Sequence, residues 1–320
     1  MKETNDNLWL IGTGLMAEEY AKVLKALGIG FIAIGRGEDR AHSFSKEFDV
    51  VTYTGGLSEF LKKKPLLPEK VIVAVGIEAL TETTLLLLNY GVTDILLEKP
   101  GIGYPKEIKS IINALPAEVN VLLAYNRRFY SAVRKARELI IADGGVKSYF
   151  FEFTEWSHTI KDLVKDPAEH ENWFLGNSTH VIDTAFFLGG KPVELSAYHA
   201  GSLDWHPSSS IFVGAGISEN NALFSYTANW AAPGRWSVEM MTSKHRFIMK
   251  PIEKLFVQEI GSVQIAPVEL TDENLDIDFK PGIYLQTQAF LESDYTDFCT
   301  IEEQFKLMET YIKMSGYSYS

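Results

Sequence analysis

The sequence predicts an α/β protein: an N-terminal, doubly wound parallel sheet, then an α+β domain with a large open, mostly antiparallel sheet. Short aliphatic runs alternate with helical segments up to about residue 124, and a glycine-rich turn follows the first run. After about residue 145, period-two alternation with aromatic residues takes over. We therefore place one domain at residues 1–124 and a second at residues 125–320, with C-terminal helices over 284–314 that pack back onto the first domain.

The strands of the first domain are predicted from runs of four or five aliphatic residues, as expected of strands covered on both faces. These runs stand at 8–11, 30–34, 71–75, 94–97 and 120–124. Segments of helical length lie between them, such as 15–28, which has one apolar face and ends at Gly28. Strands separated by helices imply right-handed crossovers and parallel pairing.

The first run leads into the pattern G-x-G-x-x-A, made by Gly12, Gly14 and Ala17. The first glycine permits a tight turn, the second lets a diphosphate approach the backbone, and the small third residue lets the helix lie close to the strand. A plain turn is the alternative interpretation, but strand, loop and helix start fall in register. The sequence therefore predicts a Rossmann dinucleotide site. The loop residues expected to bind the cofactor are Gly12, Thr13, Gly14, Leu15 and Met16.

The residue at the end of the second strand indicates which cofactor binds, because an NAD enzyme usually carries an acidic residue there. This chain has Arg36 there, and Glu38 and Asp39 come slightly too late. A guanidinium suits a ribose 2′-phosphate through its charge and planar donor fork. We therefore favour NADP(H), while NAD(H) remains possible if Arg36 is only a solvated loop residue.

The second half alternates in a way that is typical of an antiparallel sheet with one open face. A helix is expected over 131–145 and another over 178–190, and a helical tail over 284–314. Strands are expected at 146–156, 194–205, 210–217, 222–230, 236–242 and 245–250. An open face that carries Tyr, Phe and Trp needs a cover, so we expect a homodimer or homotetramer formed through the sheet.

The segment Glu98-Lys99-Pro100 follows the strand at 94–97. Ligands bind at the carboxyl edge of open α/β sheets, so Lys99 is placed to face the nicotinamide end of a bound dinucleotide. Proline restricts the residue before it, and the Lys99–Pro100 bond can be cis. A charged residue that merely precedes a turn is the alternative. Gly76, after the strand at 71–75, and Glu98 are further cofactor candidates.

His180 and Asp183 are three residues apart on an expected helix and therefore share one face. Asn177, Ser178 and Thr179 are all good N-cap residues, which places His180 in the first turn, where the helix dipole favours a neutral imidazole. A histidine near neutrality can exchange a proton during hydride transfer. A purely structural histidine is the alternative.

The segment that follows the strand at 120–124 carries the substrate candidates Tyr125, Asn126 and Arg127, at the predicted domain junction. One arginine of the pair Arg127 and Arg128 could bind an anionic group of the substrate, and the other is expected in solvent or in a salt bridge. Core packing is an equal alternative for Tyr125. Trp173 is a further candidate for substrate binding.

Composition excludes several classes of partner. The net charge is −12, so nucleic acids and acidic membranes, which need a basic surface, are not expected partners. One cysteine permits no intrachain disulfide, no apolar stretch reaches the length of a spanning helix, and the N-terminal residues do not resemble a signal peptide. We expect a cytoplasmic protein without a metal site.

The order of motifs resembles the Gfo/Idh/MocA family of oxidoreductases, named for glucose–fructose oxidoreductase and inositol dehydrogenase. The motifs are GxGxxA, "EKP", "YNRRF", and "STHVID" before "FFLGGKP". The resemblance implies oxidation or reduction of a sugar, polyol or nucleotide-linked sugar carbon with a nicotinamide cofactor, in an oligomer. It also implies that Lys99 orients the reacting oxygen, His180 acts as acid and base, and Asp183 positions substrate or histidine.

Two departures bear on the substrate. The segment "VAVGIEALTETT" lacks a Thr-Pro-Asn stretch that relatives often carry, and "NWFLGNST" lacks a glycine-rich run. The general pattern resembles members linked to bacterial surface-polysaccharide sugars. Two alternatives stay open: an NAD-dependent glycosidase on the same scaffold, which consumes no free NAD(P)H, and a non-catalytic dinucleotide-binding accessory protein.

Overall fold

The computed structural model describes residues 7–102, 107–163 and 167–317 of the 320-residue chain, and it divides into two compact units. The first unit comprises residues 1–126 and 275–306, and the second comprises 127–274 and 307–320. The chain therefore leaves the first unit once, returns to it near residue 275, and ends in the second unit.

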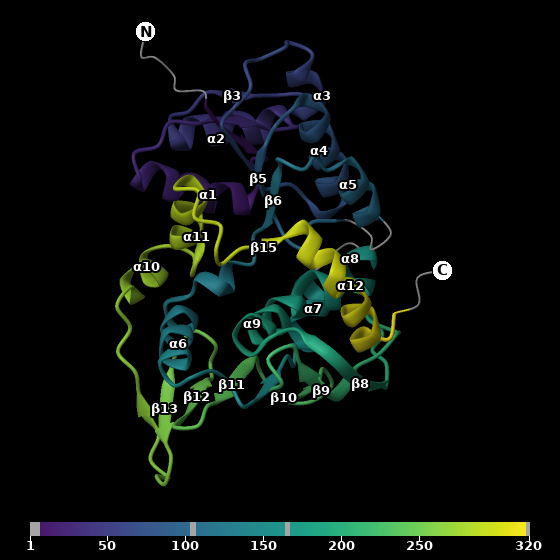
Figure 1. Ribbon diagram of the computed structural model, residues 1–320. Helices are drawn as coiled ribbons and strands as arrows, with labels where there is room; N and C mark the ends of the chain where they lie inside the picture. Colours follow the sequence, from purple (N-terminus) through teal and green to yellow (C-terminus); the bar gives the residue numbers. More distant parts are fainter. Residues whose placement is uncertain (1–6, 103–106, 164–166, 318–320) are drawn as a thin grey trace. The chain divides into compact units, whose positions relative to one another are not determined.

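The first unit is built around a sheet with the strand order β15-β6-β5-β4-β1-β2-β3. Figure 1 labels β3, β5, β6 and β15 of this sheet. Strands β1 to β6 pair in parallel, and β15 pairs antiparallel with β6. The strands are β1 (Leu8–Ile11), β2 (Ile32–Ile34), β3 (Thr52–Tyr53), β4 (Lys70–Val73), β5 (Asp94–Leu97), β6 (Asn120–Leu123) and β15 (Cys299–Thr300). All five predicted strands are present. The sequence did not predict β3 and β15, because two residues are too few to form a pattern.

Helices surround this sheet, as the strand–helix alternation predicts. They are α1 (Leu15–Ala26), α2 (Glu38–Phe48), α3 (Gly56–Leu61), α4 (Ile77–Tyr90), α5 (Ile108–Ala114) and α11 (Ile283–Leu291). Helix α1 packs against α11, and α4 packs against α5. The hydroxyl of Tyr20 on α1 approaches the side-chain oxygen of Gln286 on α11 at 3.4 Å, in a fully buried contact. The last helix, α12 (Ile301–Ser315), begins in the first unit and ends in the second.

The second unit is built around a sheet with the order β14-β13-β12-β11-β7-β10-β9-β8. Its neighbouring strands are antiparallel, except for the parallel pair β7 and β10. The strands are β7 (Ser148–Glu152), β8 (Pro192–Ala200), β9 (Ile211–Ser218), β10 (Leu223–Asn229), β11 (Ser237–Met241), β12 (His245–Met249), β13 (Phe256–Glu259) and β14 (Ala266–Pro267). The predicted fold class, a parallel doubly wound sheet plus a large antiparallel sheet, is confirmed.

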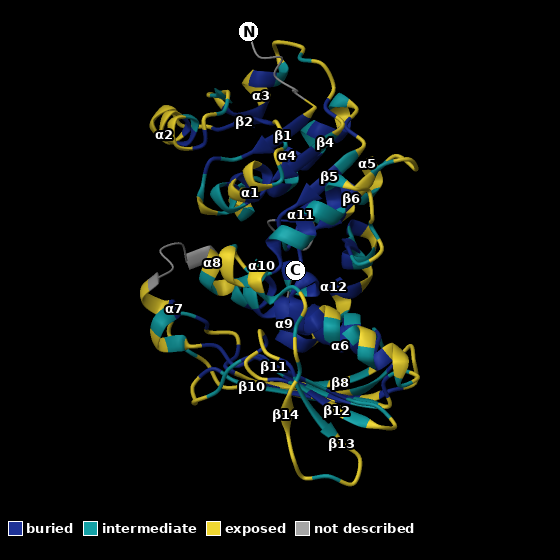
Figure 2. Cartoon of the chain, turned by 90° about the vertical axis from the view of Figure 1, so that its left-hand side faces the viewer, coloured by how far each residue is buried: buried dark blue, intermediate teal, exposed yellow. Residues whose placement is uncertain are grey.

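Helix α9 covers one face of this second sheet and packs against β7 and β11. Every residue of α9 except Phe187 is buried, as the dark blue of this helix in Figure 2 shows. The other helical segments are η2 (Asn126–Phe129), α6 (Ser131–Ala142), α7 (Ser157–Leu163), α8 (Pro167–Glu171), the π-helical turn η3 (Phe174–Ser178) and α10 (Glu273–Asp278). Stacked rings of Phe151, Phe224 and Tyr226 form the aromatic core beneath α9.

The opposite face of the second sheet is open along β8, β9 and β10: exposed residues alternate in β9 and β10, and every residue of β8 is exposed or partly exposed. Large apolar side chains lie exposed on these strands: Val193, Tyr198, Ile211, Val213 and Leu223. In the described residues, no helix combines the length and the apolar character that crossing a bilayer requires.

Candidate cofactor and substrate sites

The glycine-rich turn after β1 has a conformation that only glycine fits. Gly12 has a φ of +119°, and a Cβ atom on it would lie 2.2 Å from the carbonyl oxygen of Ala74, far inside van der Waals contact. A Cβ on Gly14 would meet only Arg40, at an ordinary 3.5 Å, so the protein itself leaves space at this second glycine. Ala17 is fully buried where α1 packs on the sheet. The turn therefore brings α1 close to β1 and leaves the backbone at Gly14 open to a ligand.

A pocket of about 540 Å³ opens at this turn and lies wholly within the first unit. Its walls come from the carboxyl ends of β1, β2 and β4, which are neighbours in the sheet at the point where the strand order reverses. This edge is where doubly wound sheets bind nucleotides. Five predicted cofactor residues line the pocket together: Gly12, Thr13, Gly14, Arg36 and Gly76.

Two arginines line this pocket, Arg36 after β2 and Arg40 on α2. Arg36 forms a salt bridge of 3.5 Å with Glu78, and both side chains are mostly exposed. An exposed salt bridge stabilises a protein by about 0–1 kcal/mol. Arg36 can therefore leave Glu78 and bind a phosphate at a small cost in free energy. We did not predict Arg40 from the sequence. Its position four residues after Arg36, at the start of a helix, could have indicated it.

The remaining predicted cofactor residues lie outside the walls of this pocket. Leu15 is largely exposed at the start of α1, and the Met16 sulfur receives a contact from the ammonium of Lys280 at 3.1 Å. Glu98 and Lys99 follow β5, the strand beside β4. Their contact with a cofactor stays a prediction.

Glu98 is held inside the first unit. The Tyr20 hydroxyl donates a hydrogen bond of 2.9 Å to its carboxylate. Burial raises the pKa of Glu98, while the charge of Lys99 and the Tyr20 hydrogen bond oppose the rise. The next peptide bond, Lys99–Pro100, is cis, one of the two forms that the sequence allowed. The Pro100 carbonyl accepts a 3.3 Å hydrogen bond from the amide of Gln304.

Tyr125 and Asn126 are core residues of the first unit. The Tyr125 hydroxyl donates to the side-chain oxygen of Gln304 at 3.2 Å, and the Asn126 amide donates to the carbonyl of Pro281 at 2.9 Å. Both side chains are at least 95% buried. These contacts support the packing alternative for Tyr125, and contact of either residue with substrate stays a prediction.

His180 and Asp183 lie on α9 in the second unit, as predicted, and both are buried. The Asp183 carboxylate receives two hydrogen bonds from Arg128, of 2.9 Å from Nε and 2.6 Å from the terminal nitrogen. The two side chains are 4% and 1% exposed, so this is a buried bidentate ion pair. Arg128 is therefore in a salt bridge, and it fixes the position of Asp183.

The predicted N-cap before His180 is wrong. The chain is already helical there, because the π-helical turn η3 runs directly into α9, and Ser178 has helical φ and ψ with no capping bond. Asn177 and Ser178 instead donate hydrogen bonds of 3.0 and 2.8 Å to the buried carboxylate of Glu155. His180 therefore does not lie at a free helix N-terminus, whose dipole was the reason to expect a neutral imidazole.

Arg127 points to a different environment from Arg128. Its guanidinium lies 4.6 Å from the ring centroid of Trp236, and the His180 ring lies 6.4 Å from the same indole. Trp173 packs edge-on against Trp205 at 6.2 Å. Sequence reasoning missed Glu155, Arg235 and Trp236, because single charged or aromatic residues at strand ends carry no distinctive pattern.

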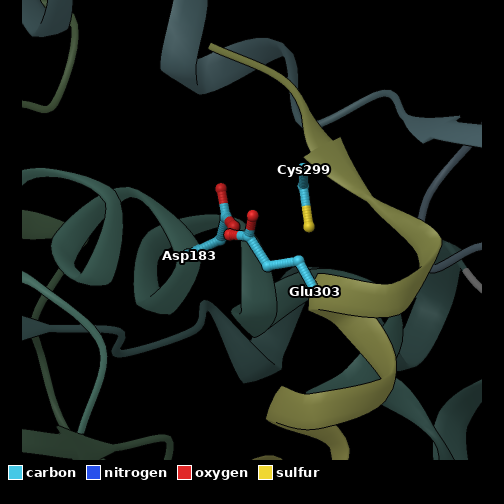
Figure 3. Close-up of side chains that lie close together, drawn as sticks. All are labelled: Asp183, Cys299 and Glu303. Carbon is cyan, nitrogen blue, oxygen red and sulfur yellow. The ribbon is translucent and has the colours of Figure 1, made fainter. Parts of the chain in front are cut away.

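Figure 3 shows three side chains with potential metal ligands: Asp183 on α9, Cys299 on β15 and Glu303 on α12. Within the first unit, the Cys299 sulfur and a Glu303 carboxylate oxygen lie within 4.8 Å of each other. The Asp183 carboxylate belongs to the second unit, where it binds Arg128. Two ligands are fewer than the three or four of a zinc site, so the described residues of neither unit by itself provide one here.

Neither a protein-family model nor a curated protein sequence matches the chain. Solved structures do. An oxidoreductase from Agrobacterium radiobacter, in complex with NAD⁺, L-tartaric acid and magnesium, has a TM-score of 0.76 at 14% identity, covering 95% of this chain and 93% of its own. The chain has the fold of this oxidoreductase.

Two further structures with this fold are similar over nearly the whole length. Levoglucosan dehydrogenase in complex with NADH has a TM-score of 0.77 at 15% identity, covering 96% of this chain and 95% of its own. The UDP-N-acetylglucosamine 3-dehydrogenase GnnA from Acidithiobacillus ferrooxidans has a TM-score of 0.75 at 13% identity, covering 97% and 96%. At such identities the likeness establishes the fold, and the chemistry has to be argued from the residues.

Proposed function

We propose that the chain is an NAD(P)-dependent oxidoreductase that transfers a hydride to or from a CH–OH carbon of a sugar, polyol or nucleotide-linked sugar. The observation that carries the proposal is the turn at Gly12. Its glycine-only geometry opens a pocket at the strand-order reversal, and five residues predicted to bind a dinucleotide line that pocket. Structural neighbours that bind nicotinamide cofactors and act on sugars support it.

The residues of the pocket fit a dinucleotide. The Gly14 backbone at the start of α1 can accept a diphosphate, since first-turn amides of a helix bind anions. We favour NADP(H), because Arg36 and Arg40 together offer two guanidiniums for a 2′-phosphate. NAD(H) remains the alternative, since Glu38 and Asp39 line the same pocket and could bind ribose hydroxyls.

The nicotinamide ring, when bound, supplies the hydride acceptor or donor. In the oxidation direction His180 takes the hydroxyl proton as the carbon loses hydride, and in reduction it returns that proton. Lys99 donates a hydrogen bond to the reacting oxygen and stabilises the charge that develops on it. Asp183, fixed by Arg128, positions the substrate or the imidazole. The proposal requires that Lys99 and His180 act on the same substrate.

The experiment that tests this function follows NAD(P)H absorbance with D-glucose, myo-inositol and UDP-N-acetylglucosamine as probes. For the best substrate, Lys99→Met and His180→Asn should each lower kcat/KM by roughly 10²–10⁴-fold, while His180→Asn leaves dinucleotide affinity unchanged. Lys62→Met is the matched control, because Lys62 is exposed and pairs with Glu59, one turn away. Equal activity of all variants would refute the catalytic roles, and turnover without net NAD(P)H change would favour the glycosidase alternative.

The preference between cofactors has a direct test in fluorescence titration with NADPH and NADH. Arg36→Ala and Arg40→Ala should each weaken NADPH binding by roughly 10-fold and leave NADH binding nearly unchanged, since one charged hydrogen bond contributes about 1.5 kcal/mol. Equal affinities of the unmodified protein for the two dinucleotides would remove the 2′-phosphate role.

We also propose a homodimer or homotetramer that covers the open face of the second sheet. The exposed apolar residues of β8, β9 and β10 support it, because such a face on a monomer would leave a large apolar patch in water. The cytoplasm, which supplies nicotinamide dinucleotides, is the location that we propose. A role in bacterial surface-polysaccharide metabolism is a finer proposal, supported by the neighbour that acts on UDP-N-acetylglucosamine.

A further inference from the structure

An arginine of the second unit is clamped between two indole rings. The guanidinium carbon of Arg235 lies 4.5 Å from the ring centroid of Trp156 and 4.6 Å from that of Trp236. The Trp156 ring is itself fixed, because its Nε1 donates a 3.1 Å hydrogen bond to the Gly234 carbonyl. Ring contacts of this kind hold the faces of a guanidinium and leave its N–H edge available.

The charge of Arg235 has no counterion in the part of the chain that the structure describes. No described carboxylate lies within ion-pair distance of it, and no described group accepts a hydrogen bond from it. The carboxylate of the nearby Glu155 accepts hydrogen bonds from the side chains of Asn177 and Ser178. Burial raises the pKa of Glu155, while the hydrogen bonds from Ser178 and Asn177 and the charge of Arg235 oppose the rise.

A second cation shares the Trp236 indole with Arg235. The Arg127 guanidinium lies 4.6 Å from the same ring centroid. Burial lowers the pKa of Arg127; Tyr130, Glu253 and Glu155 oppose that shift, and the positive charge of Arg235 adds to it. Two cations gathered at one buried ring repel each other, and an anion bound beside them relieves that repulsion.

This cationic cluster, Arg127, Arg235 and Trp236, adjoins the proposed proton-transfer residue. The His180 ring packs 6.4 Å from the Trp236 ring. Arg235 and His180 are therefore neighbours of the same indole ring.

We propose that the substrate of this site carries an anionic group, a carboxylate or a phosphate, which Arg235 binds through its guanidinium edge. The inference rests on the proposed function for the role of His180, and it narrows the substrate class from sugars in general to acidic sugars, sugar phosphates or nucleotide-linked sugars. The Arg235 fork matches the paired oxygens of either group.

The test measures binding by calorimetry, with and without NADP⁺, so that it does not depend on turnover. The probes are D-glucuronate, D-glucose 6-phosphate and UDP-glucose, with D-glucose as the neutral reference. The variants are Arg235→Gln and Arg235→Lys. Arg246→Gln is the matched control, because Arg246 is an arginine of the same sheet whose charge is already paired with Glu239.

At least one anionic probe should bind more tightly than D-glucose. Arg235→Gln should weaken that probe by about 10–100-fold, which corresponds to the loss of a charged hydrogen bond. Arg235→Lys should be intermediate, because it keeps the charge without the fork, and Arg246→Gln should bind like the unmodified protein. Preference for D-glucuronate identifies a carboxylate, and preference for the other two anions identifies a phosphate.

The inference is overturned if no anionic probe binds, if D-glucose binds as well as the anions, or if Arg235→Gln leaves anion binding unchanged. Failure of the proposed function is seen separately, as the absence of NADPH and NADH binding in the fluorescence titration.

Discussion

Replacing Arg128 by methionine should destabilise the second unit by about 3–5 kcal/mol. The variant removes two hydrogen bonds, of 2.9 and 2.6 Å, and leaves the Asp183 carboxylate, which is 1% exposed, without the guanidinium that neutralises it. Breaking one half of a buried ion pair costs about 3–5 kcal/mol, whereas an exposed pair contributes about 0–1 kcal/mol. The loss should also lower kcat, because Asp183 loses its fixed orientation.

Urea unfolding followed by tryptophan fluorescence measures this effect. Five of the six tryptophans, all except Trp9, belong to the second unit, so the signal reports mainly on that unit. Arg134→Met is the matched control, since it breaks a half-exposed pair with Asp272 in the same unit. Adding Asp183→Leu to Arg128→Met should recover most of the stability, because neither charge of the buried pair then remains. A loss below about 1 kcal/mol for Arg128→Met, equal to that of the control, would refute the reasoning.

Three further predictions follow from single contacts. Gly12→Ala should abolish dinucleotide binding in a fluorescence titration, because the added Cβ meets Ala74, while Gly28→Ala, with open space around it, should keep binding. The raised pKa of Glu155 means that its protonated form is favoured on folding, so its contribution to stability is full below about pH 4.3 and is lost as pH rises through the folded pKa; Glu155→Gln should make urea stability less steeply pH-dependent above about pH 4.3. Tyr198→Glu should lower the molar mass measured by light scattering if the open sheet face is the subunit interface, and an unchanged mass would contradict that interface.

The sequence predicted those parts of the fold that have a periodic pattern. Aliphatic runs gave the five main strands of the first sheet, and period-two alternation gave β7 to β12 of the second. Strands of two residues, such as β3 and β15, have no period and are defined by pairing alone. The π-helical turn before α9 was missed for a related reason: Asn177 and Ser178 are good N-caps in isolation, but the buried Glu155 binds their side chains instead.

In the candidate site, too, only the features with a local sequence pattern were predictable. The glycine turn was predictable because only glycine fits a backbone approach of this kind, and sequence spacing records that requirement directly. Arg127 and Arg128 could not be told apart, since adjacent identical residues differ only in what surrounds them after folding. The clamp on Arg235 brings together the ends of β7 and β11, and no local pattern reports such a pairing.

The arginines Arg128 and Arg235 illustrate how environment separates a structural charge from a binding charge. Arg128 is buried and its fork is taken by one carboxylate, so it can only position Asp183. Arg235 is held by ring faces, which fix its position but do not satisfy its donors. An anionic group of a ligand can pair with guanidinium donors that are held in position in this way. The same physical rule that makes Arg128 a support for α9 therefore makes Arg235 a selector of substrate.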